Sequence, residues 1–586
     1  MCGIVGYIGK RRAQQLVFSS LAKLEYRGYD SSGIAVRGSG ITVNKDCVRV
    51  SELEAKSAPL EGTIGIGHTR WATHGRPVAP NSHPHMDCTG KIAVVHNGVI
   101  TNYQHLKDKL IEEGHIFTSE TDTEVIPHLI EKYYRGNLEE AVTMASYELE
   151  GSYAIAVITE DESKMVVARR DSPLVIGIGD SEYFVASDVP ALLDFTNRVV
   201  FMENGDIGIL QRDNLKILNN NKIIKRDYKT IGWTIQDIQK SGFEHFMLKE
   251  IHEEPRVVRN TIAANNLRDS WPDIFSDKGM LIIACGSSYH AGCVGGRIIE
   301  DLLNIPTVVM FASEFNYRLR YPAPEKALLI TQSGETADVL LAMRKLKEQG
   351  SKCLVVTNVT DSSASRLADE VIYIDAGPEI SVAATKSFTA QLVIMYQLAL
   401  HYQTGPEFNG LRDELRLLPA RLQFLLDNQE QIKDCAHWLA KASNAFFIGR
   451  GLNFPIAQEG ALKLKEISYI HAEACAAGEL KHGPLALLET DTPVIAVTAP
   501  DQTYTAMLTS IKEVKARGAR VISIGTLGSS ELLKESDEVL RIPDVHPLLS
   551  PVLYTTILQL LAYHTARERN CPIDFPKNLA KSVTVE

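Results

Sequence analysis

The chain has 586 residues, which is too many for one hydrophobic core and, at about 150 residues per domain, predicts three or four domains. Apolar residues make up 45% and charged residues 23% of the sequence, as is usual in globular proteins. The net charge of −11 argues against a general nucleic-acid-binding protein, which requires a basic face. No uncharged apolar run reaches about 18 residues, and Lys10, Arg11 and Arg12 follow the first apolar run instead of preceding it. We therefore predict a cytoplasmic protein without a membrane span or a signal peptide.

The nine cysteines are odd in number, scattered, and never spaced as Cys-x-x-Cys. This distribution argues against a zinc ribbon or a dithiol redox motif. We predict reduced thiols that are chemically inert, with the exception of Cys2, and we predict no metal and no cofactor.

Residues 2–230 are predicted to form an α+β domain. Short β-like runs separated by turn residues occur at 64–67, 92–95, 152–158, 165–168 and 183–186, with a helical stretch at 123–134. This pattern is typical of antiparallel sheets accompanied by helices. Residues 231–255 break the rhythm and are predicted to be a linker that leads into a helix.

From residue 256 onward, continuous apolar runs alternate with helical stretches. The runs are 281–285, 327–331, 354–357 and 371–374, and a second series follows at 445–448, 494–498 and 521–524. Strands without polar alternation indicate parallel sheets covered on both faces. We predict two tandem α/β domains, each an αβα sandwich, at 256–425 and 426–568, and a C-terminal tail at 569–586.

The N-terminus carries the strongest chemical signal, because removal of Met1 would make Cys2 the first residue. A terminal cysteine combines a thiol nucleophile with an α-amine whose pKa is about 7.7–8.0, so the amine can accept a proton near neutral pH. A cysteine at position 2 can also be incidental. The accompanying motifs decide between the two interpretations.

Five motifs accompany Cys2, namely 27–33, 68–75, 83–85, 96–98 and 119–123. Each has an ordinary explanation when taken alone. Asn97-Gly98 is a common turn sequence, His68 and His74 can be loop histidines with satisfied hydrogen bonds, and Arg70 can be a surface charge. Their joint occurrence behind Cys2 favours a catalytic site.

The region resembles the class II glutamine amidotransferase domain, of the N-terminal-nucleophile hydrolase type, in the stretches 2–4, 27–31, 69–75, 96–98 and 121–123. The resemblance implies that Cys2 attacks the side-chain amide of glutamine while its own amine handles the protons through water. It also implies that the Asn97 side chain and the Gly98 N–H stabilise the tetrahedral oxyanion.

The same resemblance implies a binding site for the rest of the glutamine molecule. Arg70 would hold the α-carboxylate through paired hydrogen bonds, and Asp122 would pair with the α-amine. Trp71, Thr73 and His74 would line the site, with Trp71 acting as a gate.

Two loops in the third quarter of the chain are rich in small hydroxyl residues, Gly286-Ser287-Ser288 and the stretch from Thr331 to Thr336. A strand, a small-residue turn and a helix N-terminus together form an anion site, because backbone N–H groups and the helix dipole point at the ligand. The alternative is plain helix capping, since Ser and Thr are favoured caps. Two such loops in one domain favour a phosphorylated ligand.

A later segment adds charged residues that suit acid–base chemistry. Lys463 and Glu466 are three residues apart on a predicted helix and share one face, although a surface ion pair would look the same. His482 stands next to glycine, where the backbone can approach a ligand closely.

This second half resembles a pair of sugar isomerase (SIS) domains, and the whole chain resembles the glutamine–fructose-6-phosphate aminotransferase (isomerizing) family. The resemblance implies that glutamine and fructose 6-phosphate are the ligands, that ammonia passes internally between two sites, and that glucosamine 6-phosphate and glutamate are the products. The residues expected at the sugar phosphate are Cys285, Gly286, Ser287, Ser288, Thr331, Gln332, Ser333, Thr336 and Val382.

The family likeness also implies catalytic roles in the sugar site. Glu466 would move a proton between C1 and C2 with Lys463 beside it. His482 would assist ring opening from a neighbouring subunit, which requires at least a dimer. Lys581 would form the Schiff base with the open-chain ketose.

One departure from the family keeps the identity of the sugar substrate open. Ala384 stands where the family usually has a serine that contacts the sugar, and the loss of one neutral hydrogen bond costs about 0.5–1.5 kcal/mol. The same chemistry on another ketose phosphate is one alternative. A catalytically silent sugar-phosphate sensor is the other, since SIS domains also serve as binding modules. The residues that count against a sensor are Cys2, Asn97, Glu466, His482 and Lys581.

Overall fold

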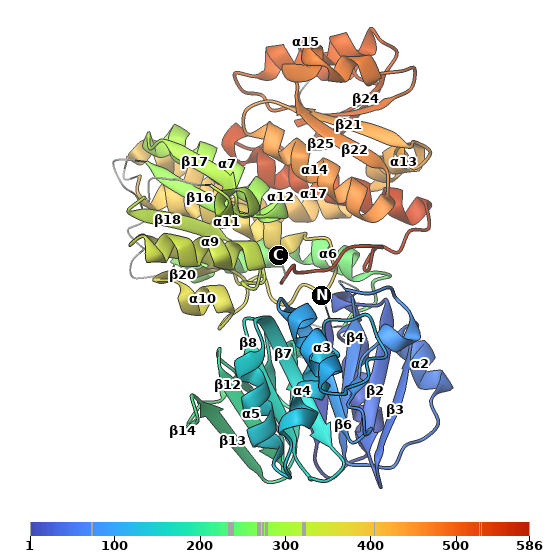
Figure 1. Cartoon of the computed structure of the whole chain (residues 1–586). Coiled ribbons are helices and arrows are strands. Elements are labelled where there is room, and N and C mark those ends of the chain that lie inside the picture. Colours follow the sequence, from blue (N-terminus) through green and yellow to red (C-terminus); the bar gives the residue numbers. More distant parts are fainter. Residues whose placement is uncertain are drawn as a thin grey trace. The chain divides into compact units, whose positions relative to one another are not determined.

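The computed structural model describes residues 2–71, 74–231, 239–266, 271, 275, 279–318, 324–403, 405–526, 528 and 530–584. The chain divides into two compact units, shown in Figure 1. The first comprises Met1–Ile238 and Ala580–Glu586, and the second comprises Gln239–Leu579.

The first unit contains two antiparallel sheets. The eight-stranded sheet has the spatial order β15 (Lys229–Thr230), β11 (Arg198–Phe201), β9 (Val175–Ile178), β10 (Tyr183–Ala186), β1 (Gly3–Ile8), β4 (Ile64–Arg70), β2 (Ser31–Arg37) and β3 (Ile41–Asp46). The seven-stranded sheet has the order β14 (Lys222–Ile224), β13 (Asn214–Asn219), β12 (Asp206–Gln211), β8 (Met165–Arg170), β7 (Gly151–Thr159), β6 (Ile92–Ile100) and β5 (His85–Met86).

These two sheets pack face to face between helices. In β6, Ala93 and Val95 belong to the core shared with the eight-stranded sheet, whereas Ile92 and Val94 belong to the core under the helices. The alternation follows from the two-residue period of a strand. Helices α1 (Ala13–Ala22) and α2 (Val50–Lys56) accompany the eight-stranded sheet, and α3 (Tyr103–Glu112), α4 (Val125–Tyr133) and α5 (Leu138–Glu148) accompany the seven-stranded one.

The second unit contains two five-stranded sheets in which every pairing is parallel. The first has the order β17 (Thr307–Phe311), β16 (Met280–Ala284), β18 (Lys326–Ile330), β19 (Lys352–Thr357) and β20 (Glu370–Tyr373). The second has the order β22 (His471–Ala476), β21 (Asn444–Gly449), β23 (Pro493–Val497), β24 (Arg520–Thr526) and β25 (Glu538–Ile542).

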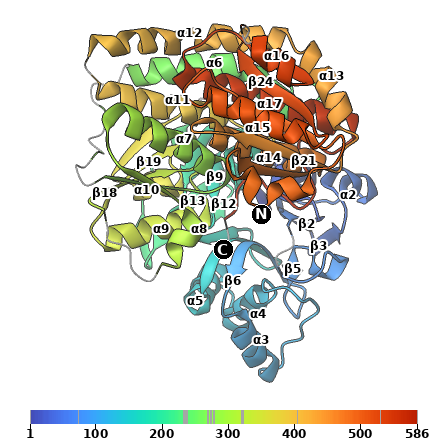
Figure 2. The same ribbon diagram turned by 90° about the horizontal axis from the view of Figure 1, so that it is seen from above.

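Helices cover both faces of each parallel sheet. Around the first sheet, Figure 2 shows α6 (Phe246–Asn266) and α11 (Lys386–His401) on the side opposite α8 (Ala312–Asn316) and α9 (Ala337–Glu348). The other helices of this unit are α7 (Gly286–Leu303), α10 (Ser363–Leu367), α12 (Asn409–Asp427), α13 (Glu430–Leu439), α14 (Asn453–Ser468), α15 (Tyr504–Lys515), α16 (Ser530–Glu535) and α17 (Ser550–Glu568).

One apolar core joins the two parallel-sheet domains of this unit. It contains Ile282 and Val294 from β16 and α7 together with Ile456 and Leu558 from α14 and α17. Because the two domains share a core, a side chain on α7 and one on α14 are held in a fixed relation.

The predicted fold class is confirmed. The apolar runs assigned as strands fall on β4, β6, β7, β8 and β10 in the antiparallel part and on β16, β18, β19, β20, β21, β23 and β24 in the parallel part. The edge strand β22 was not predicted, because its alternating alanines have little β-propensity. Helix α6 begins at Phe246, inside the predicted linker, and residues 232–238 of that linker lie outside the described residues.

The structure also bears on the predicted absence of a membrane span. Among the residues it describes, no helix combines the length and the apolarity needed to cross a bilayer.

Candidate functional site

Cys2 directly precedes β1, a central strand paired with β4 and β10. Strand pairing places Gly3 opposite Thr69, so the end of β4 lies beside the nucleophile. The backbone N–H of Trp71 donates a hydrogen bond of 3.3 Å to Cys2 Sγ. The thiol is therefore held in place by the main chain that follows β4.

Asn97 lies on β6 and faces the same residue. Its Nδ2 donates to the Cys2 carbonyl at 2.9 Å, and its Oδ1 lies 3.1 Å from Nε2 of His68. His68 Nε2 also lies 2.9 Å from the His96 carbonyl. Both neighbours are acceptors, so Nε2 carries the proton and His68 is the donor. This bond sets the orientation of the Asn97 amide.

His68 is thus a buried strand residue and not a loop histidine. It lies within β4, is fully buried, and stacks on His83 with ring centroids 4.0 Å apart. Burial lowers the pKa of His68 to about 3, against an ordinary value of 6.5. His68 therefore stays neutral at physiological pH, as the donor role of its Nε2 requires.

Gly98 follows Asn97 at a backbone conformation that suits glycine. Its φ is +127°, and a Cβ at this position would lie 2.0 Å from the Ser152 carbonyl oxygen. Only glycine fits this position, so the main chain of β6 stays in place beside Asn97.

Arg70 and Asp122 are buried charged residues near the thiol. Arg70 is 3% exposed and donates to the carbonyls of His74, Gly75 and Arg76, which shapes the loop after β4. Asp122 is 4% exposed and accepts from the N–H of Ile100 at 2.9 Å. Both charges act on the Cys2 thiol, Arg70 lowering its pKa and Asp122 raising it.

The pKa of the Cys2 thiol is raised above its ordinary value. Burial is the largest cause, and it outweighs the Trp71 N–H and Arg70, which stabilise the thiolate. A thiol in this state needs a base to become nucleophilic.

Aromatic side chains flank the loop after β4. Trp71 packs edge-to-face on Tyr29 with centroids 5.9 Å apart, and His74 packs edge-to-face on Tyr103 at 5.6 Å. Thr73, which was predicted to line this site, lies outside the described residues.

In the second unit the two hydroxyl-rich segments follow β16 and β18, at the same edge of the first parallel sheet. Residues 331–336 form a loop as predicted, whereas 286–288 form the first turn of α7 and not a loop. Cys285 and Thr336 occupy the N-cap positions of α7 and α9, and neither side chain caps its helix. Thr331 and Thr336 place their hydroxyl oxygens 3.3 Å apart instead. Within the second loop, Thr331 Oγ1 and Ser333 Oγ accept from the N–H groups of Gly334 and Glu335 at 3.2 and 3.1 Å. The N-terminal amides of α9 point towards this loop.

A buried charged cluster connects α7 to α14. Ser287 Oγ donates to Glu459 at 2.9 Å and accepts from Lys463 Nζ at 3.2 Å. Lys463 Nζ lies 3.4 Å from Glu459 and 2.6 Å from Glu466. His290 completes the cluster, with Nδ1 2.8 Å from Glu459.

Exposure excludes the surface ion pair as an explanation for Lys463 and Glu466. The Lys463 side chain is 1% exposed, and those of Glu459 and Glu466 are 2% and 19% exposed. Burial alone would lower the pKa of Lys463, but Glu466 and Glu459 raise it above its ordinary value. Lys463 is therefore a permanent ammonium group.

Comparison with known proteins places both units in one family. A glutamine amidotransferase domain model matches residues 68–194, and an SIS domain model matches 273–401 and 438–569. The chain is 46% identical over 611 residues to the glutamine–fructose-6-phosphate aminotransferase (isomerizing) of Caldanaerobacter subterraneus, and 47% over 605 residues to that of Thermococcus kodakarensis. Both alignments cover 100% of each chain. The chain belongs to this family.

A solved structure agrees with the family assignment. The C-terminal domain of glucosamine-fructose-6-phosphate aminotransferase from Francisella tularensis is 38% identical, with a TM-score of 0.54, and the match covers 57% of this chain and 99% of that one. The predicted resemblance to the glutamine–fructose-6-phosphate aminotransferase family is thereby confirmed.

Within each unit, the structure brings several of the predicted residues together. Cys2, Asn97, Arg70 and Trp71 come together, as do Ser287, Lys463 and Glu466. His482 is exposed in a short 3-10 helix, Glu479–His482. Lys581 belongs to the first unit, whereas Lys463 belongs to the second.

The other residues predicted at the sugar phosphate have varied surroundings. Ser288 accepts from Gln391 Nε2 at 3.0 Å, Gln332 and Ser333 are half-buried, and the N–H of Val382 donates to the Asp574 carbonyl at 3.1 Å.

Several important residues escaped the sequence reasoning. His68 orients Asn97, and Glu459 holds Ser287 and Lys463 together. Asp574 ties the C-terminal tail to α6, accepting from the N–H groups of Phe246 and Met247 at 2.9 and 3.0 Å. Glu459 precedes Lys463 by four residues on α14, so the two side chains share one face of the helix. This spacing could have revealed the role of Glu459 in the sequence. Asp574 carries no comparable signal, since its partners are remote in sequence.

Proposed function

We propose that the chain transfers the amide nitrogen of glutamine to fructose 6-phosphate, giving glucosamine 6-phosphate and glutamate. One observation carries the proposal: a single chain holds both a positioned N-terminal thiol and a buried Ser287–Lys463–Glu466 cluster beside hydroxyl-rich segments. The full-length match to relatives that bear this name supports the same conclusion.

The first half-reaction is glutamine hydrolysis. With Met1 removed, the α-amine of Cys2 takes the thiol proton through water, and Sγ attacks the amide carbon of glutamine. The tetrahedral intermediate releases ammonia, and water then hydrolyses the thioester to glutamate. The raised pKa of the thiol is consistent with this need for a base.

Asn97 and Gly98 are proposed to stabilise the oxyanion of that intermediate. An amide NH₂ has two hydrogens. In the structure Asn97 Nδ2 uses one of them for the Cys2 carbonyl at 2.9 Å, which leaves the second for the oxyanion, together with the Gly98 N–H. Arg70 is proposed to bind the glutamine carboxylate and Asp122 the amine, with Trp71, Thr73 and His74 around them.

The second half-reaction is amination and isomerisation of the sugar phosphate. The phosphate is proposed to bind at residues 286–288 and 331–336, where helix N-terminal amides and hydroxyl groups converge. Cys285, the residue before Gly286, and Val382 are proposed to line the same sugar-phosphate site. Glu466 is proposed to move the proton between C1 and C2, with the ammonium of Lys463 stabilising negative charge next to it.

Lys581 is proposed to form the Schiff base. The attacking lysine must be neutral, and Lys463 is held as an ammonium by two carboxylates. Lys463 is therefore unsuited to attack the ketose, and the family resemblance assigns this attack to Lys581. His482 is proposed to assist ring opening from a neighbouring subunit, so that the active form is at least a dimer. Internal passage of ammonia and a cytoplasmic location belong to the same proposal.

The test is to incubate the purified chain with glutamine and a panel of ketose phosphates and to identify the products by mass spectrometry. Amino sugar from fructose 6-phosphate is the expected result, and it would make Ala384 a neutral difference. A preference for another ketose phosphate would reassign the sugar substrate. Formation of neither glutamate nor amino sugar would overturn the proposal in favour of a silent sensor.

A further inference from the structure

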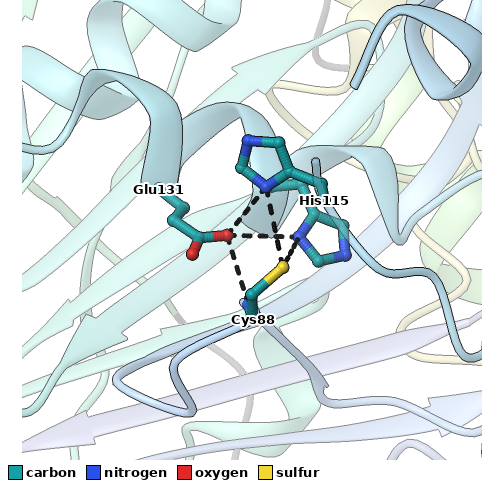
Figure 3. Close-up of side chains that lie close together, drawn as sticks. Cys88, His115 and Glu131 are labelled. Atoms are coloured by element: carbon teal, nitrogen blue, oxygen red, sulfur yellow. Dashed lines mark hydrogen bonds and ion pairs between the residues drawn. The ribbon is translucent and has the colours of Figure 1, made fainter. Parts of the chain in front are cut away.

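Four potential metal ligands converge in the first unit, in a cluster that the glutamine chemistry does not use. They are Cys88, His115, His128 and Glu131, and their ligand atoms all lie within 4.8 Å of one another. Figure 3 shows Cys88, His115 and Glu131 directed towards a common point. The four side chains supply one sulfur, two nitrogens and one carboxylate oxygen, a set that zinc accepts.

The distances within the cluster have the size expected around a tetrahedral ion. Cys88 Sγ lies 3.7 Å from His115 Nδ1 and 3.5 Å from His128 Nδ1. Glu131 Oε2 lies 3.0 Å from His115 Nδ1 and 3.3 Å from His128 Nδ1. Zinc bond lengths of about 2.0–2.3 Å at tetrahedral angles put neighbouring ligand atoms about 3.3–3.6 Å apart. Four of the six distances between the ligand atoms therefore differ from these values by only a few tenths of an ångström, and the other two are at most 4.8 Å.

The three segments that bear these ligands are built before any ion binds. Cys88 lies in the turn between β5 and β6, where Asp87 Oδ1 accepts from the N–H groups of Lys91 and Ile92 at 2.8 Å each. His115 follows the C-terminal end of α3, and its N–H donates to the Leu110 carbonyl at 2.9 Å. His128 and Glu131 are three residues apart on α4 and so share one face.

The sulfur also accepts a hydrogen bond from the main chain. The N–H of Ile116 donates to Cys88 Sγ at 3.4 Å. The ring of His128 is 1% exposed, and its second nitrogen lies 4.0 Å from Glu124 Oε1, so a carboxylate is near the ligand but beyond hydrogen-bond distance. Carboxylates behind ligating histidines are typical of metal sites. Cys88 itself is exposed, which gives an ion access from solvent.

We propose that Cys88, His115, His128 and Glu131 bind one Zn²⁺ ion. The thiol proton of Cys88 passes to solvent as the ion binds. All four positions are filled by protein side chains, so the site is structural, since catalytic zinc sites keep one position open. The sequence prediction of no metal missed the cluster because its ligands come from three separate segments without a Cys-x-x-Cys pair.

The position of the ion gives it a function in the glutamine amidotransferase unit. It ties the β5–β6 turn to α4 and to the segment that begins at His115. Glu124, behind His128, accepts from the N–H groups of Thr118 and Ser119 at 2.8 and 2.7 Å. The ion would therefore stiffen residues 115–124, the segment that presents Asp122.

The first test measures metal in the full chain purified without chelators. Inductively coupled plasma mass spectrometry is expected to find one zinc per chain in the wild type and in Cys47→Ser, a half-buried cysteine outside the cluster. Cys88→Ser and His115→Gln are expected to lose the metal, because loss of a ligand weakens binding more than the roughly 10–100-fold typical of a second-shell change. This readout needs no substrate, so it stands apart from the proposed function.

The second test uses the wild-type chain and does not depend on variants that fold poorly. Chelator-treated protein titrated with Co²⁺ is expected to show the visible bands of a tetrahedral site and a thiolate-to-metal charge-transfer band. Amide exchange over residues 115–131 is expected to slow when Zn²⁺ is added. Wild-type protein that purifies without metal and gives no thiolate charge-transfer band with Co²⁺ would overturn the proposal and leave a hydrogen-bonded cluster.

Discussion

Replacement of Lys463 by methionine removes the single cation of the buried cluster between α7 and α14. Glu459, which is 2% exposed, would keep its hydrogen bonds from Ser287 and His290 but lose the ammonium 3.4 Å away. Removing one partner of a buried ion pair costs about 3–5 kcal/mol. Glu466 is 19% exposed and can turn to water, so we expect the lower end, about 3 kcal/mol.

Hydrogen exchange measures this effect in the second unit alone. A loss of about 3 kcal/mol corresponds to a roughly 100-fold faster exchange of the most protected amides in α14, at about 1.4 kcal/mol per tenfold change. The direction in which this stabilisation changes with pH follows from the raised pKa of Lys463. The stabilisation is present below the ordinary lysine pKa and is lost only as the pH rises above it, so pH 7 is a suitable condition.

A double variant separates charge from packing. Lys463→Met with Glu459→Gln removes the unpaired carboxylate while keeping an oxygen for Ser287, so it is expected to be more stable than Lys463→Met alone. Coupling energies between contacting residues are about 0.5–3 kcal/mol. If Lys463→Met changes exchange less than fivefold, or if the two changes simply add, then the charges do not hold the two domains together and the reasoning fails.

Further predictions concern the two reactions and the buried histidine. Cys2→Ala is expected to abolish glutamine hydrolysis and spare sugar-phosphate isomerisation. Lys581→Ala is expected to spare glutamine hydrolysis and stop amino-sugar formation. A product assay checks both variants, and loss of both activities in either one would contradict the two-site model. His68, with its pKa lowered to about 3 from 6.5, is expected to cost the first unit about 2 kcal/mol of stability between pH 6.5 and 5, because only the unfolded chain takes up the proton. Urea unfolding at these two pH values measures this loss. His68→Asn is expected to lower by about one the number of protons that the unfolded chain binds in excess of the folded chain at pH 5. If the pH dependence of the unfolding free energy is the same in this variant as in the wild type, the His68 ring is not a neutral buried group.

Several parts of the glutamine site could be predicted from short motifs. Cys2, Arg70 and Asn97-Gly98 stand in local sequence patterns whose chemistry follows from residue type, and the structure places these residues together. His68 was in one of the same motifs, but its role could not be inferred. Which acceptor faces Nε2 depends on the pairing of β4 with its neighbours and on the packing of the two sheets.

The sequence by itself indicated the order of the domains, the type of each sheet and the residues that we propose as reactive groups. Period-two alternation, continuous apolar runs and small-residue loops act over a few residues, so they can be read locally. Only the tertiary structure decided that Glu459 joins Ser287 to Lys463 and that Cys88 meets His115, His128 and Glu131. Such contacts depend on how helices and turns remote in sequence pack against one another, and local patterns do not encode that packing.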